Sequence, residues 1–219
     1  MIDFTIPEET KAVRDKVRAF VQSECHPAEE TCNADNFDET LAGLRSKARS
    51  QGLWCPFIPT EHGGMGLRPL ANALVQMELG ESYLGALSLN TQGPDDATML
   101  TLLEHGTDFQ KEKFLTPLLN GEKRICYSMT EKAAGADATG MQTTAVLDGD
   151  EWVLNGEKWF SSSASVADIA VVMAKTDPDA ARHEQYSTFI VELPNPGYHI
   201  VRNIETMQPH TELGLKLGG

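Results

Sequence analysis

The sequence has no long hydrophobic run and comparatively little positive charge. No stretch of eighteen consecutive apolar residues occurs in its 219 residues, so no transmembrane helix is expected. The opening MIDFTIPEET is acidic and lacks the apolar core of a signal peptide, so we expect a cytoplasmic protein. Lys and Arg number 18 against 32 Asp and Glu, which gives a formal net charge of −14. Nucleic acid and anionic membranes both need basic surface, so neither is an expected partner.

Signatures of metal and nucleophile chemistry are also missing. The chain has no GxSxG, HExxH or P-loop motif, so no catalytic residue is assigned from motifs. GGMGL (63–67) lacks the third glycine of a dinucleotide-binding loop and follows a helical pattern, which favours an interhelical turn. The six histidines show no ligand spacing, and no metal site is expected. Reduced thiols are the simplest interpretation of the four cysteines, which form no CxxC pair: Cys25, Cys32, Cys55 and Cys126.

Hydrophobic periodicity divides the chain into two parts. Apolar residues recur at helical spacing in five segments before residue 122: 7–24, 38–50, 69–83, 94–103 and 107–121. Thr107 or Asp108 is the predicted N-cap of the last segment. The later pattern is one of short runs rich in Val, Ile, Thr and aromatic residues: 124–129, 141–147, 151–154, 157–163, 169–175, 187–193 and 198–203. DGD (148–150) and NG (155–156) predict hairpin turns between these strands.

Helices followed by strands predict an α+β protein. We expect a helical N-terminal domain over 1–121 and a middle β-domain over 122–219, the latter antiparallel and barrel-like. The final residues, PHTELGLKLGG, predict neither a paired strand nor a capped helix. The β-domain is therefore expected to be incomplete.

Two strand-end segments combine hydroxyl groups with small side chains: MTEKAAGAD (129–137) and EKWFSSSAS (157–165). Backbone N–H groups are free to hold a polar or anionic ring at such ends. Two interpretations stay open on these residues alone: a tight turn, which the composition favours, or a seat for a large flat ligand. Trp159 and Phe160 are predicted to face opposite sides of a strand, with core packing and ligand contact both open.

These two segments carry a family resemblance. Thr130–Asp137 is similar to the TEPxAGSD motif of the acyl-CoA dehydrogenases, and Asn155–Ser162 is similar to their NGxKxWIT segment. IPTEHGGMG (58–66) resembles the family's Pro/Glu/Gly-Gly-x-Gly loop, and the likeness extends to about residue 203. The resemblance implies an N-terminal helical domain and a middle β-barrel-like domain. It also implies FAD bound between the middle domain and a C-terminal helical domain.

The resemblance also implies site residues. Thr130 and Ser162 are expected to donate hydrogen bonds to the flavin, and Phe160 is expected to form an aromatic wall at the family's tryptophan position. Glu131 is expected to order the loop rather than to act as a base. The full set of expected cofactor contacts is Tyr127, Met129, Thr130, Phe160, Ser161 and Ser162.

Two substitutions depart from the family pattern in the first motif. Ala136 stands at the substrate-binding position where the family has a serine, so one hydroxyl contact to acyl-CoA is lost. Lys132 replaces the family proline, which adds a charge and frees the backbone φ.

The function implied by the resemblance is FAD-dependent α,β-desaturation of an acyl-CoA thioester. The expected partners are the acyl-CoA substrate and an electron acceptor such as an electron-transfer flavoprotein, with homo-oligomerisation possible in the full-length form. The family's catalytic base is a carboxylate of the C-terminal domain, so we expect a truncated form with little activity alone. Two alternatives stay open: an acyl-CoA oxidase-like enzyme or other flavin oxidase or hydroxylase of the same superfamily, and a non-catalytic remnant or subunit.

Overall fold

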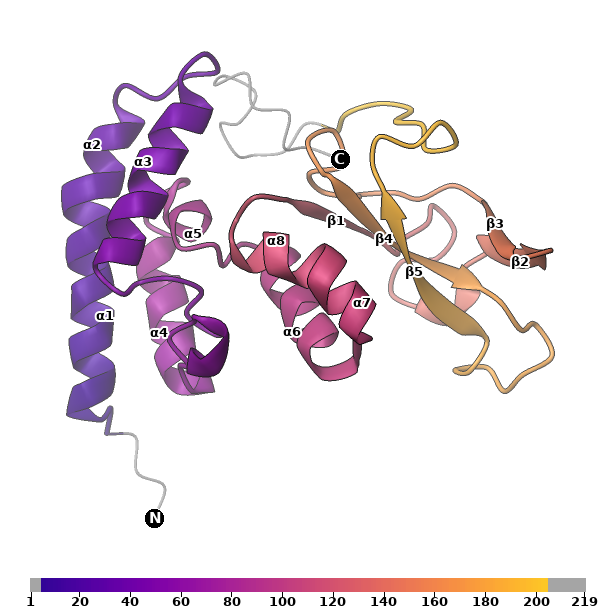
Figure 1. Cartoon of the computed structure of the whole chain (residues 1–219), viewed down its shortest axis with the longest axis horizontal. Helices are drawn as coiled ribbons and strands as arrows, with labels where there is room; N and C mark the ends of the chain where they lie inside the picture. Colours follow the sequence, from indigo (N-terminus) through magenta and orange to yellow (C-terminus); the bar gives the residue numbers. More distant parts are fainter. Residues whose placement is uncertain (1–4, 205–219) are drawn as a thin grey trace. The chain divides into compact units, whose positions relative to one another are not determined.

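The computed structural model describes residues 5–204 of the chain, which divides into two compact units, Met1–Glu122 and Lys123–Gly219 (Figure 1). The first unit is helical and the second is built on a β-sheet. The α+β class predicted from the sequence is confirmed. No helix within residues 5–204 is long and apolar enough to cross a membrane.

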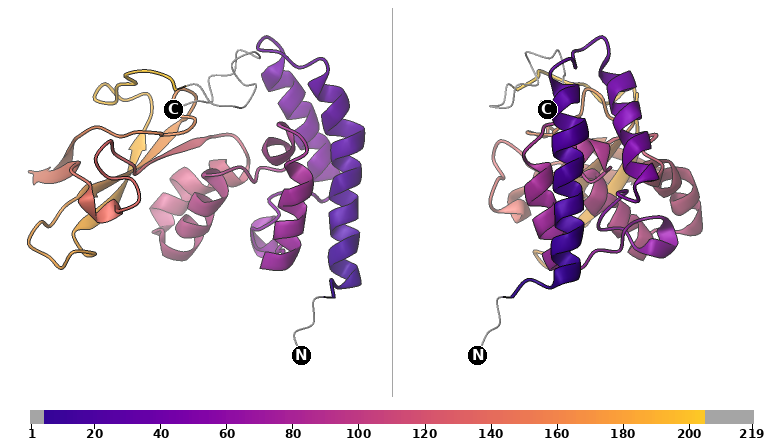
Figure 2. Two further views of the ribbon diagram at one scale, coloured as in Figure 1. Left: turned by 180° about the vertical axis from the view of Figure 1, so that it is seen from behind. Right: turned by 90° about the vertical axis from the view of Figure 1, so that its left-hand side faces the viewer.

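The helical unit begins with a long rod in which three helical segments follow one another without a break, as Figure 2 shows: α1 (Glu8–Phe20), a π-helical turn η1 (Val21–Cys25) and α2 (His26–Glu29). The remaining α-helices are α3 (Phe37–Ser50), α4 (Pro69–Leu79), α5 (Gly85–Ser88), α6 (Asp95–His105), α7 (Asp108–Gln110) and α8 (Thr116–Leu119). Between them lie η2 (Thr60–His62) and η3 (Lys111–Leu115).

Apolar residues at helical spacing bury the inner faces of these helices. Val17 and Phe20 of α1, Leu41 and Leu44 of α3, and Val75 of α4 are almost fully buried. The helices predicted at 7–24 and 38–50 form where periodicity places them, because spacing of three and four residues puts these side chains on one face. Thr107 is the N-cap of α7, where its side chain and that of Gln110 form a reciprocal capping box.

The GGMGL segment is an interhelical turn, as predicted. Gly63 ends η2 in the left-handed region with φ 83°. A Cβ on Gly64 would lie 2.1 Å from the backbone oxygen of Ile58. Both glycines are therefore required by the path of this chain, one by its backbone angle and one by a close approach.

The second unit holds a five-stranded sheet: β1 (Ile125–Ser128), β2 (Thr144–Asp148), β3 (Glu151–Asn155), β4 (Ile169–Lys175) and β5 (Tyr186–Glu192). The central strand, β4, pairs antiparallel with β5 along its whole length. It pairs parallel with β1, in the register Ile125 to Ile169, and touches β2 in parallel at Lys175. The sheet is therefore mixed, and the expectation of a wholly antiparallel domain is wrong because residues 129–168 return the chain to β4 in the direction of β1.

Two of the seven predicted strands do not form. Residues 157–163 form an irregular segment, because Phe160 (φ 59°) and Ser163 (φ 68°) adopt left-handed backbone angles that interrupt an extended chain. Residues 198–203 pair with no strand among the described residues. Trp159 and Phe160 consequently do not alternate across a sheet as predicted.

The two predicted hairpin turns have different outcomes. Asp148 pairs with Glu151 across Gly149 (φ 63°), so DGD joins β2 to β3 as predicted. β3 ends at Asn155 with no hairpin. The reason for glycine at 156 is a close approach, since a Cβ there would lie 2.3 Å from the Thr143 hydroxyl. All four cysteines lie within the described residues and none forms a disulfide bond, as expected.

Candidate functional site

The two segments singled out in the sequence lie side by side in the β unit. The backbone N–H of Trp159 donates to the carbonyl oxygen of Thr130 at 2.8 Å. The ammonium group of Lys158 donates to the carbonyl oxygen of Met129 at 3.0 Å. Residues directly after β1 are thus joined to the irregular segment after β3, which brings the two groups of predicted flavin contacts together.

A buried ion pair lies at the centre of this junction. Lys158 Nζ and Glu131 Oε1 are 2.9 Å apart, and the two side chains are 10% and 7% exposed. Glu131 also accepts hydrogen bonds from the backbone N–H groups of Gln142, at 2.6 Å, and Thr143, at 2.9 Å. Lys158 also contacts Met141 Sδ at 3.4 Å. Glu131 therefore orders the loop, as predicted.

Burial and hydrogen bonding act in opposite directions on this carboxylate. Burial alone would raise the pKa of Glu131, but donors from Thr143, Gln142 and Lys158 outweigh it and hold the pKa at about 2. Burial lowers the pKa of Lys158, and the neighbouring Glu131 opposes that change. A carboxylate of such low basicity is a poor acceptor for a substrate proton.

Small residues after Glu131 leave open surface. Ala133 and Ala136 are exposed, and a Cβ built on Gly135 would meet nothing within 4 Å. Gly135 also has no left-handed φ, so neither a strained angle nor a close approach in this chain requires glycine there. Ala136 lies on the open part of this loop, at the predicted substrate position. Residues 131–134 form a tight turn, in which the backbones of Glu131 and Ala134 exchange two hydrogen bonds, and Gly135 follows it in open space.

The alternation of β1 separates the predicted contacts from the interior. Cys126 and Ser128 are buried, whereas Tyr127 between them is half-buried. Met129 and Thr130 continue beyond the strand and are half-buried as well. Ser162 is exposed, and within residues 5–204 its hydroxyl and that of Thr130 make no hydrogen bond. Both hydroxyls are available to a ligand.

The segment after Lys158 holds an aromatic ring at the surface. The side chain of Phe160 is 59% exposed, and its ring centroid lies 5.5 Å from that of Trp159. A left-handed non-glycine residue costs about 1 kcal/mol, and Phe160 and Ser163 both adopt this region. Such strain clusters at binding sites. An exposed ring, two available hydroxyls and a bare loop fit the isoalloxazine of a flavin.

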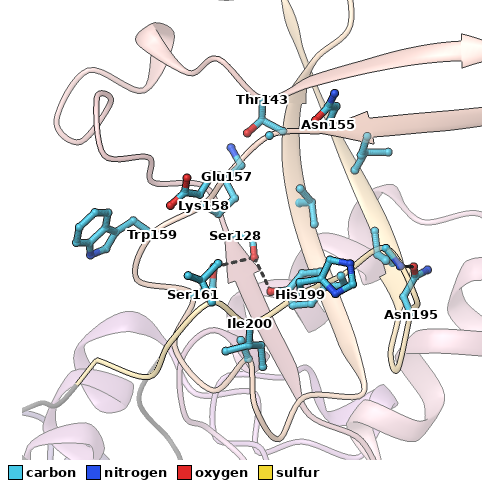
Figure 3. Close-up of a pocket in the computed structure, with 18 of the residues that line it drawn as sticks. Ser128, Thr143, Asn155, Glu157, Lys158, Trp159, Ser161, Asn195, His199 and Ile200 are labelled. Atoms are coloured by element: carbon cyan, nitrogen blue, oxygen red, sulfur yellow. Dashed lines mark hydrogen bonds between the residues drawn. The ribbon is translucent and has the colours of Figure 1, made fainter.

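Ser161 is buried, whereas the next residue, Ser162, is exposed. Ser161 is 8% exposed, and its hydroxyl lies 2.9 Å from that of Ser128. Ser128 is in turn 3.3 Å from the Tyr198 hydroxyl (Figure 3). These three groups line a cavity of about 580 Å³ inside the β unit, together with Asn155, Asn195 and His199. The Ser161 side chain is thus turned toward the cavity.

Three residues of this region were not among the predicted contacts: Ser128, Lys158 and Tyr198. Lys158 occupies the lysine position of the NGxKxWIT segment, so the motif held a signal for it. Ser128 directly precedes the predicted Met129 contact, but its direction depends on strand register. Tyr198 had no signal, because residues 198–203 were assigned to a strand and the contact spans seventy residues of sequence.

The far end of the bare loop is tied to the connection between β4 and β5. Arg182 pairs with Asp137 at 2.5 Å and donates to the Thr139 hydroxyl at 2.6 Å. The Tyr186 hydroxyl donates to the Thr139 carbonyl oxygen at 2.5 Å. Hydrogen bonds from the Thr139 hydroxyl and backbone N–H, and then the charge of Arg182, lower the pKa of Asp137. Both ends of the loop are therefore anchored, the first by a buried pair and the second by an exposed one.

Comparisons with known proteins identify the class. Residues 7–122 match the family model of the acyl-CoA dehydrogenase N-terminal domain, and residues 126–216 match that of the middle domain. The chain therefore belongs to the acyl-CoA dehydrogenase family.

Individual relatives agree with this assignment. Acyl-CoA dehydrogenase family member 11 of Gallus gallus is 35% identical over 202 residues, which cover 85% of this chain and 26% of the relative. FadE2 of Mycobacterium tuberculosis, described as an acyl-CoA dehydrogenase, is 39% identical over 165 residues, which cover 73% of this chain and 40% of the relative. The structure of a Mycobacterium abscessus protein described as an acyl-CoA dehydrogenase superposes with a TM-score of 0.85 at 33% identity. The match covers 93% of this chain and 55% of that one. The chain thus spans about a quarter to about half the length of these relatives.

Proposed function

We propose that this chain forms the flavin-binding side of an FAD-dependent acyl-CoA dehydrogenase that desaturates an acyl-CoA thioester between its α- and β-carbons. The observation that carries the proposal is the open surface at Gly135, in the loop that follows Thr130, together with the exposed ring of Phe160. Membership of the family supports the choice of FAD and of acyl-CoA.

When bound, FAD supplies a hydride acceptor for the substrate β-carbon. The proposed part of this chain is to orient that acceptor. The hydroxyls of Thr130 and Ser162 donate hydrogen bonds to the polar edge of the ring, and Phe160 packs against it. Tyr127, Met129 and the backbone of Ser161 complete the contact surface.

Removal of the substrate α-proton requires a base with a higher pKa than Glu131 has. The Glu131 carboxylate accepts hydrogen bonds from two backbone N–H groups and from Lys158, and its pKa is about 2. We therefore assign Glu131 a structural role and assign no catalytic base to residues 5–204.

The open loop around Ala136 is proposed to contact the acyl-CoA. Because alanine lacks a hydroxyl, this contact rests on the backbone and the methyl group. The proposed electron acceptor is a flavoprotein, and the proposed assembly of the full-length form is a homo-oligomer.

Ala136 also favours a second candidate, an oxidase or hydroxylase of the same superfamily. A substrate other than acyl-CoA would not need the serine that Ala136 replaces. Oxygen consumption compared with reduction of a dye acceptor, measured on the longer parent protein, distinguishes the two. Dye reduction without oxygen uptake supports the dehydrogenase, and uptake of one oxygen per substrate supports the oxidase.

Titration of the purified 219-residue chain with FAD tests the proposal. We expect saturable binding, a shift of the flavin absorbance bands and quenching of flavin fluorescence as the ring leaves water. Phe160→Ala should weaken this binding, because it removes the aromatic wall. No saturable FAD binding, or equal binding by Phe160→Ala, contradicts the proposed seat.

A further inference from the structure

The buried pair of Lys158 and Glu131 connects the two segments of the proposed flavin seat. Lys158 lies directly before Trp159 and Phe160 in one segment, and its ammonium group contacts the Met129 carbonyl in the other. Glu131 lies directly after Thr130 and accepts from Lys158 at 2.9 Å. Each member of the pair thus belongs to one segment and bonds to the other.

The contact between the Lys158 ammonium group and the Met129 carbonyl fixes the direction of the Thr130 N–H. In a trans peptide the carbonyl of one residue and the N–H of the next point in opposite directions. Holding the Met129 carbonyl toward Lys158 therefore turns the Thr130 N–H away from it. Among the described residues this N–H donates to no backbone carbonyl, so it is available to a ligand on that side.

The Thr130 carbonyl is fixed as well. It accepts from the N–H of Trp159 at 2.8 Å, which sets the distance between the two segments. The peptide groups on both sides of Thr130 are thereby held by Lys158 and its neighbour. We propose that Lys158, held by Glu131, is a positioning residue that presents the Thr130 N–H and hydroxyl to the flavin in register with Phe160 and Ser162.

This inference rests on the proposed function, and it assigns Lys158 no contact with substrate. Long flexible side chains lose rotational freedom when buried, so a lysine kept at this place needs compensating bonds. Lys158 has three acceptors: the Met129 carbonyl, Glu131 and the Met141 sulfur. Three bonds match the three donors of an ammonium group.

The test compares Lys158→Met with Lys132→Met in the full 219-residue chain. Lys132 lies next to Glu131 in the same loop but is exposed, so the control removes the same charge from the loop surface. We expect Lys158→Met to weaken FAD binding about tenfold, the scale of one lost charged hydrogen bond, and Lys132→Met to change it less than twofold. Lys158→Arg, which keeps the charge and the donors, should restore part of the affinity.

A second readout needs no flavin. Amide hydrogen exchange in the flavin-free protein should accelerate at Trp159 and Glu131, whose N–H groups donate to the Thr130 and Ala134 carbonyls, in Lys158→Met, and remain at the wild-type rate in Lys132→Met. If Lys158→Met does not fold by circular dichroism, Glu131→Gln serves in both measurements. It keeps an acceptor oxygen for one of the two backbone amides, those of Gln142 and Thr143, and we expect the same direction of change.

The outcomes separate the two proposals. Wild-type protein that binds FAD, together with a folded Lys158→Met or Glu131→Gln protein of equal affinity, overturns the positioning role alone. Unchanged exchange in the folded variant overturns it as well. Wild-type protein without FAD binding contradicts the proposed function, and accelerated exchange at both segments then still supports the coupling of the two segments through Lys158.

Discussion

Two loops of this chain are rich in glycine and other small residues, but the causes differ. In the 58–66 loop of the helical unit, Gly63 has φ 83° and Gly64 lies against the Ile58 carbonyl. In the 131–140 loop of the β unit, Gly135 has neither a left-handed angle nor a neighbour within 4 Å. The path of the chain requires glycine in the first loop, whereas in the second loop Gly135 lies in open space directly after the buried Ala134. The proposed ligand surface is therefore assigned to the second loop and not to the first.

The second loop is also anchored unequally at its two ends. Glu131 is bound to Lys158 in the interior, whereas Asp137 pairs with Arg182 where both side chains are about two-thirds exposed. Water screens the exposed ion pair and can solvate either of its charges if the partner is lost. The buried pair has no water to replace a lost partner. The rigid end therefore lies beside Thr130, where the proposed ligand needs fixed donors.

The largest expected effect is that of Glu131→Ala. The substitution leaves the Lys158 ammonium buried without its partner and removes the acceptor of two backbone N–H groups. We expect the free energy of unfolding of the β unit to fall by about 3–5 kcal/mol, measured by urea denaturation. Asp137→Ala is the matched control at the exposed end and should cost less than about 1 kcal/mol. Equal losses in the two variants would remove the distinction between the ends.

Acid should weaken the same end of the loop. The pKa of Glu131 is about 2 in the folded protein and lies near 4.3 for an ordinary glutamate, so the folded state binds this proton less tightly. The stabilisation is complete above about pH 5.5 and is lost as the pH falls toward 2, amounting to about 3 kcal/mol. Denaturation curves between pH 6 and 2.5 measure it. Glu131→Gln should lose less stability over that range, and an identical pH dependence in both proteins would show that other carboxylates are responsible.

A smaller loss is expected from Gly64→Ala in the helical unit. The added methyl would meet the backbone of Ile58 at 2.1 Å, and backbone cannot rotate away as a side chain can. We expect a loss of about 1–3 kcal/mol in the stability of the helical unit, read from its denaturation midpoint. Gly43→Ala, in α3 with nothing within 4 Å of its Cβ, is the control and should be neutral or stabilising.

Local sequence patterns predicted most of the helical unit, because helical spacing and capping act within a few residues. Thr107 illustrates this, since its capping partner is three positions away. The parallel pairing of β1 and β4 depends on contacts more than forty residues apart, for which no local pattern exists. The segment 157–163 was assigned to a strand because its aromatic residues favour strands, yet left-handed angles at Phe160 and Ser163 turn it into a loop.

The candidate site shows the same division. Its two segments were found from motifs, since residue type and order are visible in a sequence. The different burial of Ser161 and Ser162 was not, because it follows from the irregular backbone around them. The role of Lys158 likewise required its distance to the Met129 carbonyl.

The smallest effect on stability, and the sharpest contrast between the two loops, is expected from Gly135→Leu. Open space surrounds this position and its φ is not left-handed, so the free energy of unfolding should change by less than about 0.5 kcal/mol. A leucine there would nevertheless fill the open space at this position of the loop. We expect binding of FAD, or of an acyl-CoA to the FAD-loaded protein, to weaken at least about tenfold because a flat ligand could no longer approach the backbone. Calorimetric titration measures the affinity for both ligands, and urea denaturation measures the free energy of unfolding. A stable variant that binds both ligands as the wild type does would reduce the 131–140 loop to a turn, as the 58–66 loop is.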